Sequence, residues 1–223
     1  IHDKIGGNVD TIHNARQDVY ATAAARQEYV DRPEYESKKY HGDKRYIAKN
    51  ALDTKAQAEG NLKDTYTGKT MGNKHVDPRN LDHTIAAKEM HDDAGRILAG
   101  RDGVEMANDS SNLNPTQERF NKFKGQRRAD DIVVQLEKES PARRVRITEL
   151  ESKADLTVKE RNELDLHRQK QTIADDPKHF LAADKTARDK YEAKLRDDYY
   201  NGGKFREAVV DTSIKEGGKM AFQ

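Results

Sequence analysis

The sequence predicts a mainly α-helical protein in which elongated helical flanks surround an irregular, polar centre. Only 34% of its 223 residues are hydrophobic and 36% are charged, whereas an average domain is about 25% charged. Apolar residues recur at helical spacing on both sides of the centre, and Gly, Pro, Asn and Asp gather within it. Such a chain can bury only a thin core for its length, which favours elongated helices over one compact globule.

Residues 1–61 form the predicted helical N-terminal region. Apolar residues lie at helical spacing over 8–32, and Pro33 ends that helix because proline breaks the hydrogen-bond ladder. A second, highly charged helix is expected over 43–62, with Gly60 near its end.

Residues 127–223 form the predicted helical C-terminal region. Thr157 and Glu160 have the spacing of a capping box, in which each side chain bonds the backbone amide of the other. Apolar positions are sparse and often Ala, which is typical of paired or partner-bound helices and leaves room for a protein partner or a homo-oligomer. The expected helices cover residues 130–138, 142–153, 157–174, 177–201 and 204–216.

The centre, residues 62–126, is where chemistry is expected, because functional side chains concentrate on irregular segments. Residues 72–114 show no sustained period, and a short helix is predicted from Pro115 to Lys124, ended by Gly125. Four polar motifs follow one another here: YTGK at 66–69, LDHT at 81–84, SNL at 111–113 and FNKFKG at 120–125.

Each motif has a use if the substrate is a phosphodiester. The carboxylate of Asp82 is a hard oxygen ligand suited to Mg²⁺, and the imidazole of His83 can take a proton from water near pH 7. Asn121 would offer an amide oxygen to the same cation, while Asn112, nine residues earlier, would pin the preceding loop. The plainer interpretation is a helix cap for Asn112 and an exposed helical residue for Asn121.

A basic cluster follows these motifs. Lys122, Lys124, Arg127 and Arg128 are a predicted nucleic-acid contact, since phosphates attract clustered cations. The whole chain has 41 basic and 40 acidic residues. Its net charge therefore does not predict nucleic-acid binding, and any basic surface that binds phosphate must be local.

The order of these motifs resembles the HNH nucleases, the ββα-metal or His-Me finger group, in an H-N-N variant similar to the HNH module of CRISPR effector nucleases. The resemblance covers residues 62–125 and implies a small α+β module, a β-hairpin followed by a helix, that holds one divalent cation. It implies His83 as general base, Asp82 and Asn121 as metal ligands, and Asn112 as the catalytic-loop asparagine. The implied function is a metal-dependent endonuclease that uses Mg²⁺, or Mn²⁺ in its place, with DNA favoured over RNA.

The sequence departs from the compact HNH pattern between its first two motif residues. His83 and Asn112 are 29 positions apart, so an insertion must loop out. That insertion contains His91, Lys88 and Arg96, which are secondary candidates for structuring the insertion or contacting substrate. The chain has no Cys and therefore no Cys-ligated zinc.

Two other functions remain open. One is a helical binding or structural protein of a phage or defence system that carries a degenerate nuclease module. The other is an injected nuclease toxin, which the 98 residues after Gly125 disfavour. The chain shows no signal peptide and no apolar run of about 18 residues, so the bacterial cytoplasm is the expected location. The start at Ile1 predicts a fragment of a longer protein.

Overall fold

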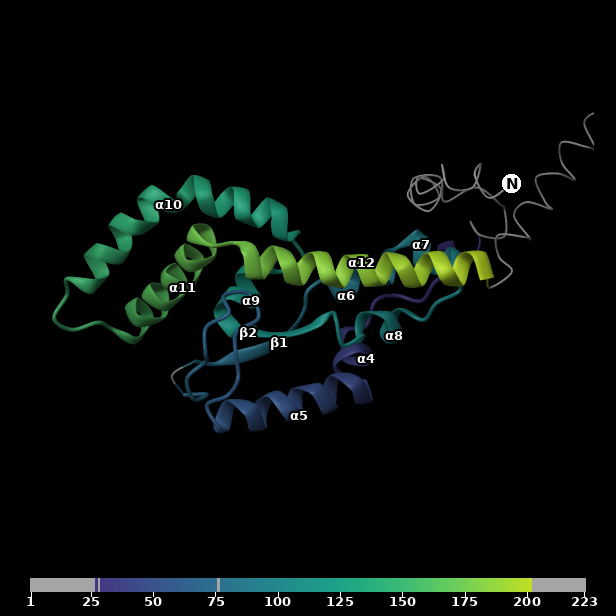
Figure 1. The fold of residues 1–223 in the computed structure, drawn as a ribbon, viewed down its shortest axis with the longest axis horizontal. Coiled ribbons are helices and arrows are strands. Elements are labelled where there is room, and N and C mark those ends of the chain that lie inside the picture. Colours follow the sequence, from purple (N-terminus) through teal and green to yellow (C-terminus); the bar gives the residue numbers. More distant parts are fainter. Residues whose placement is uncertain (1–26, 28, 76, 202–223) are drawn as a thin grey trace, which may run out of the picture.

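The computed structural model describes residues 27, 29–75 and 77–201. Within them the protein is mainly helical with one small two-stranded antiparallel sheet (Figure 1). The predicted mainly α class is therefore confirmed. The helix expected over 204–216 lies outside the described residues, and the one over 8–32 does so almost entirely. None of the described helices is long and apolar enough to cross a membrane.

The helices α4 (Ser37–His41) and α5 (Lys44–Ala58) come before the sheet. The carboxylate of Asp43 caps α5 by accepting a hydrogen bond from the amide of Arg45 at 2.8 Å. The charged helix predicted over 43–62 is thus confirmed, with an earlier end at Ala58.

The sheet pairs β1 (Arg79–His83) with β2 (Leu113–Gln117), and α9 (Glu118–Lys124) follows β2 directly. Pro115, which the sequence placed in the first turn of a helix, instead lies in β2 opposite Leu81. The two-stranded sheet tolerates a residue without an amide hydrogen, and the carbonyl of Pro115 accepts a hydrogen bond from Thr65 at 2.9 Å. The predicted end of the helix at Gly125 is confirmed, with φ of 56°.

The insertion between the strands contains three short helices, α6 (Ala87–Asp92), α7 (Ala94–Leu98) and α8 (Gly103–Ala107). The sequence predicted irregular structure here, and that was wrong because helices of five or six residues are too short to show a period. Two of these helices nevertheless have an N-cap aspartate in the sequence. The carboxylates of Asp93 and Asp102 cap α7 and α8, respectively.

Three long helices complete the fold: α10 (Ala129–Glu151), α11 (Val158–Asp175) and α12 (Lys178–Asn201). The capping box at Thr157 is confirmed. The two helices predicted over 130–138 and 142–153 are one curved helix, α10, with Pro141 inside it (Figure 1). The buried guanidinium of Arg143 donates a hydrogen bond to the backbone carbonyl of Leu136, five residues before the proline.

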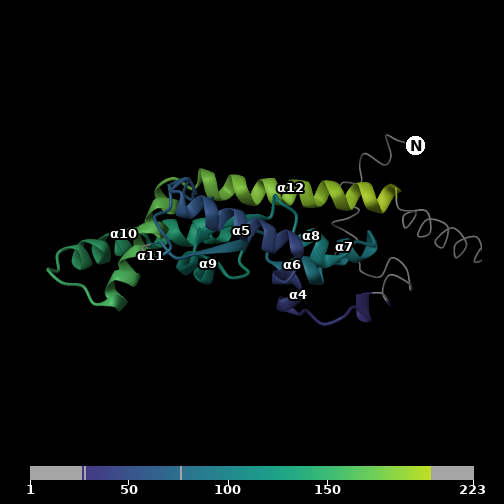
Figure 2. The same ribbon diagram turned by 90° about the horizontal axis from the view of Figure 1, so that it is seen from below.

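The described residues form two apolar cores, and α12 contributes side chains to both. Its Phe180 joins the core formed with Tyr66, Phe120, α10 and α11. Further along, its Ala187, Tyr191 and Leu195 join the core formed with α4 and the insertion. Figure 2 shows α12 running along one side of the molecule, so it connects the insertion to the α10–α11 hairpin.

Candidate active site at the end of strand β1

A buried carboxylate, Asp64, fixes the turn that begins the site. Burial raises the pKa of Asp64, and the hydrogen bonds that it accepts act in the opposite direction. The carboxylate ties the YTGK turn to β2 and α11. Its oxygens accept five hydrogen bonds of 2.8–3.0 Å, from the Tyr66, Thr67 and Gln117 amides, Thr116 Oγ1 and Gln169 Nε2. Sequence reasoning missed Asp64, although an Asp two residues before the turn is an Asx-turn signal.

The carboxylate of Asp82 forms a buried ion pair. Lys124 Nζ lies 3.0 Å from Asp82 Oδ2, and both side chains are buried. The same ammonium donates to the carbonyl of His83 at 3.1 Å, and the hydroxyl of Tyr66 donates to Asp82 Oδ2. Burial raises the pKa of Asp82, while Lys124 and the Tyr66 hydroxyl oppose that rise. Lys124 therefore supplies a fixed positive charge at the end of β1.

The hydrogen bonds around His83 define its tautomer. His83 Nε2 lies 2.9 Å from Asn108 Oδ1, and Asn108 Nδ2 donates to the carbonyl of Tyr40 at 3.0 Å. Because the amide nitrogen of Asn108 faces Tyr40, its oxygen faces His83 and must accept. His83 Nε2 therefore carries the hydrogen, and Nδ1 has the lone pair.

Burial lowers the pKa of His83 to about 4, with smaller contributions from His41 and Lys124 in the same direction and the bond to Asn108 opposing them. The ring is consequently neutral at pH 7 and can accept a proton at Nδ1. Asn108 was not a sequence candidate, since nothing in the sequence marks a residue 25 positions away as the partner of His83.

Two aromatic rings hold His83 in place. Tyr46 stacks on it, with ring centroids 5.4 Å apart and an interplanar angle of 23°, and His41 lies 5.6 Å away. The hydroxyl of Tyr46 donates to the carbonyl of Leu81 at 2.9 Å, which anchors the stacking ring to β1. The orientation of His83 is thus set on one side by Asn108 and on the other by Tyr46.

Asp82 and His83 have different partners, as expected for neighbouring residues on a strand. The partners of Asp82 come from the YTGK turn and α9, whereas those of His83 come from α4, α5 and the end of α8. Lys124 is the side chain that joins the two, through the carboxylate of one and the carbonyl of the other.

Asn112 pins the insertion at both of its ends. Its Oδ1 accepts from the amide of Ile85 at 2.7 Å, and its Nδ2 donates to the carbonyls of Ile85 at 3.1 Å and Ala107 at 2.9 Å. The side chain is almost completely buried. Asn112 is therefore placed to hold the loop: its amide bonds the backbone of Ile85 and Ala107, and its Nδ2 also lies 3.9 Å from Met90 Sδ.

Asn121 lies half-buried on α9, one turn before Lys124. Its side chain makes no hydrogen bond with any residue in the described part of the chain. The other oxygen of Asp82, Oδ1, likewise has no such partner there. Both atoms are ligand types that Mg²⁺ and Mn²⁺ accept.

Asp82 and Asn121 alone do not complete a site for a divalent cation. No three His, Cys, Asp or Glu side chains in the described ranges cluster as a complete metal cage would require. Mg²⁺ is commonly held by one or two carboxylates together with substrate phosphate and water. Asp82 and Asn121 supply one carboxylate and one amide oxygen, which suits that mode of binding.

The four predicted nucleic-acid contacts do not form one exposed surface. Lys124 is buried because Asp82 draws its ammonium into the interior. Lys122, Arg127 and Arg128 are exposed. Each of these three has a partner of its own: Glu118 for Lys122, Phe123 and Gln135 for Arg127, and Asp130 for Arg128.

The secondary candidates in the insertion contact neither Asp82 nor His83. Buried His91 bonds Tyr40, and the Arg96 guanidinium bonds backbone carbonyls only. Exposed Lys88 pairs with Asp92 at 2.6 Å. These positions therefore hold the insertion together.

No protein-family model, curated protein or solved structure matches this chain. The neutral, oriented imidazole of His83 beside the Asp82–Lys124 pair is thus the feature that points to a function.

Proposed function

We propose that the protein is a metal-dependent endonuclease that hydrolyses nucleic-acid phosphodiester bonds, with DNA favoured over RNA. We further propose that β1, β2 and α9 are an HNH-type ββα-metal module of the H-N-N variant, in a bacterial phage or defence setting. The observation that carries the proposal is the state of His83. A neutral imidazole with a defined tautomer has one ring nitrogen that can accept a proton, as a general base must, and the low pKa of about 4 makes it a weak base.

In this mechanism His83 Nδ1 takes a proton from the water that attacks phosphorus. Asn108 keeps the imidazole in the required tautomer, and Tyr46 keeps its plane. Asp82 and Asn121 would hold the divalent cation, which when bound stabilises the charge of the phosphorane and of the leaving oxygen. Lys124 adds a fixed positive charge to the same place.

Nucleic-acid contact is proposed for three exposed residues: Lys122, which lies on the same helix as Asn121, and Arg127 and Arg128, which follow that helix. Phosphates compete well with surface ion pairs, since an exposed pair contributes about 0–1 kcal/mol. Lys124 is excluded from this role by its burial.

A second candidate is a helical binding or structural protein with a degenerate module. The Asp82–Lys124 pair favours it, because an ammonium at 3.0 Å already neutralises the carboxylate that would hold the cation. Divalent-metal binding separates the two candidates. A functional site should give a saturable rise in melting temperature with Mg²⁺ or Mn²⁺ that Asp82→Ala removes, whereas a degenerate module should give none.

Cleavage of supercoiled plasmid with Mg²⁺, with Mn²⁺ and with EDTA tests the enzyme proposal. His83→Ala should lower the rate by about 10²–10⁴-fold, the usual contribution of a positioned base. His75→Ala, which removes an exposed histidine, is the matched control and should cleave at the wild-type rate. Equal cleavage by His83→Ala and the wild type would exclude His83 as the base.

A further inference from the structure

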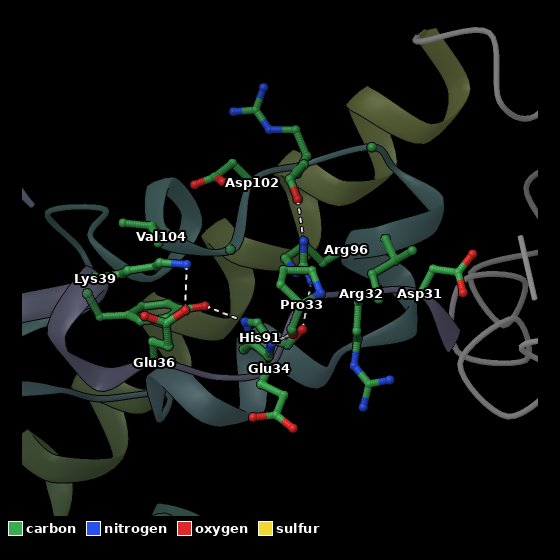
Figure 3. A pocket seen from close by; sticks show the side chains of 15 residues that line it. Asp31, Arg32, Pro33, Glu34, Glu36, Lys39, His91, Arg96, Asp102 and Val104 are labelled. Carbon is green, nitrogen blue, oxygen red and sulfur yellow. Dashed lines mark hydrogen bonds and ion pairs between the residues drawn. The ribbon is translucent and has the colours of Figure 1, made fainter. Parts of the chain in front are cut away.

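A cavity that does not include His83 lies between the segment 31–36, α4 and the insertion helices (Figure 3). Its volume is about 570 Å³, within the roughly 300–1,000 Å³ of small-molecule sites. Tyr40, His91 and Arg96 form its buried polar wall, and Lys39 lies at its edge.

The guanidinium of Arg96 is a buried charge without a carboxylate partner in the part of the chain that the structure describes. Its Nε donates to the carbonyl of Met90 at 2.9 Å. Nη1 donates to the carbonyl of Arg101 at 2.6 Å, and Nη2 to that of His91 at 2.7 Å. A guanidinium has five N–H groups, so one on each terminal nitrogen makes no hydrogen bond with a described residue. Uncompensated buried charge is costly, and an anion supplied from solution would offset that cost.

The acidic residues of this cavity do not neutralise Arg96. Glu36 pairs with Lys39 at 2.7 Å, and Asp102 accepts from the amide of Glu105 at 2.7 Å to cap α8. The other two acidic side chains, Asp31 and Glu34, turn their carboxylates away from Arg96 (Figure 3).

The buried wall is rigid. The hydroxyl of Tyr40 lies 2.7 Å from His91 Nδ1, and His91 Nε2 lies 2.8 Å from the carbonyl of Pro33, which can only accept. The chain of donors is therefore fixed from Tyr40 to His91 to Pro33. Gly103 closes the wall, and a Cβ there would lie 2.9 Å from the Tyr40 hydroxyl and 3.4 Å from Arg96 Nε. Only glycine leaves room for both side chains as they stand.

We propose that this cavity binds a small molecule through an oxyanion, a carboxylate or a phosphate, held by the two remaining N–H groups of Arg96. A planar guanidinium suits both oxyanions because it can donate two hydrogen bonds to one group. Lys39 lies at the edge of the cavity, where its ammonium pairs with Glu36. The site does not depend on nuclease activity. It adjoins the candidate active site through Tyr40, whose carbonyl holds the Asn108 amide that orients His83.

Thermal melting with sodium phosphate or sodium acetate, at constant ionic strength set by NaCl, tests this site. The wild type should show a saturable rise in melting temperature with at least one anion, and the two arms show which oxyanion is bound. Arg96→Met should abolish the rise.

Arg96 also donates hydrogen bonds to three carbonyls, which Arg96→Met removes. Two variants at surface lysines therefore provide a second test if that variant does not fold. Lys39→Glu reverses a charge at the edge of the cavity, whereas Lys38→Glu makes the same change on α4 outside it. Reversal of a charge at the edge of the cavity should weaken the apparent Kd roughly tenfold, and Lys38→Glu should leave it within about twofold. No saturable rise with either anion, or equal weakening by both variants, would overturn the proposal.

Discussion

Asn108 should contribute to the stability of the protein and should determine which ring nitrogen of His83 carries the hydrogen. Asn108→Ala removes the acceptor of His83 Nε2 at 2.9 Å and the donor to the Tyr40 carbonyl at 3.0 Å. Asn108 is almost completely buried, so water cannot replace either bond without rearrangement. Each buried group left without a partner costs about 1–3 kcal/mol, and the variant leaves two such groups, so it should lose about 2–6 kcal/mol of unfolding free energy.

Urea denaturation measures that loss, and a long-range ¹H–¹⁵N correlation spectrum of the histidine rings reports the tautomer. The wild type should show the Nε2–H form of His83, and Asn108→Ala should show a mixture. Cleavage should fall roughly 10- to 100-fold, as for other partners that orient a catalytic histidine. Asn61→Ala, at an exposed asparagine just after α5, is the control and should cost less than about 1 kcal/mol. An Nδ1–H tautomer in the wild type would refute this account of His83.

Three further changes have defined outcomes. The pKa of His83 is lowered from 6.5 to about 4 by folding, so the unfolded chain binds a proton that the folded chain does not, and stability should fall by about 3 kcal/mol as pH drops from 6.5 to 4. His83→Gln should remove that part of the pH dependence in urea titrations, and an unchanged profile would contradict it. Lys124→Met leaves Asp82 buried and unpaired and should cost about 3–5 kcal/mol in urea denaturation at pH 7, whereas a cost below about 1 kcal/mol would mean that the pair is not formed. Gly68→Ala should destabilise more than Gly60→Ala by thermal melting, because both have positive φ but only the new Cβ at 68 would meet a histidine ring, at 2.6 Å; equal costs would rule out that contact.

The parts of the fold that the sequence predicted correctly are those governed by local rules. The capping box at Thr157 and the helix stop at Gly125 depend on residues within one turn, and both are confirmed. Pro115 shows the limit of such rules. Proline fits either a first helical turn or an edge strand, and the pairing of Pro115 with Leu81, distant in sequence, decides between them.

The candidate site also combines local motifs with distant partners. Asp82, His83 and Asn112 were chosen as candidates because their motifs are short and follow one another in order. The partners that set their chemistry come from elsewhere: Asn108 lies 25 residues from His83, and Lys124 lies 42 from Asp82. Lys124 looked like part of an exposed basic run, and only the folded chain shows that its ammonium is buried against a carboxylate.

The most direct measurement of the central claim is the single-turnover cleavage of a labelled DNA duplex, with protein in excess and Mg²⁺ present, by the wild type and by His83→Ala. The account predicts cleavage by the wild type that EDTA abolishes, and a rate constant at least about 10²-fold lower for a folded His83→Ala protein. Equal rate constants for the two proteins, or no Mg²⁺-dependent cleavage of DNA or RNA by the wild type, would contradict it.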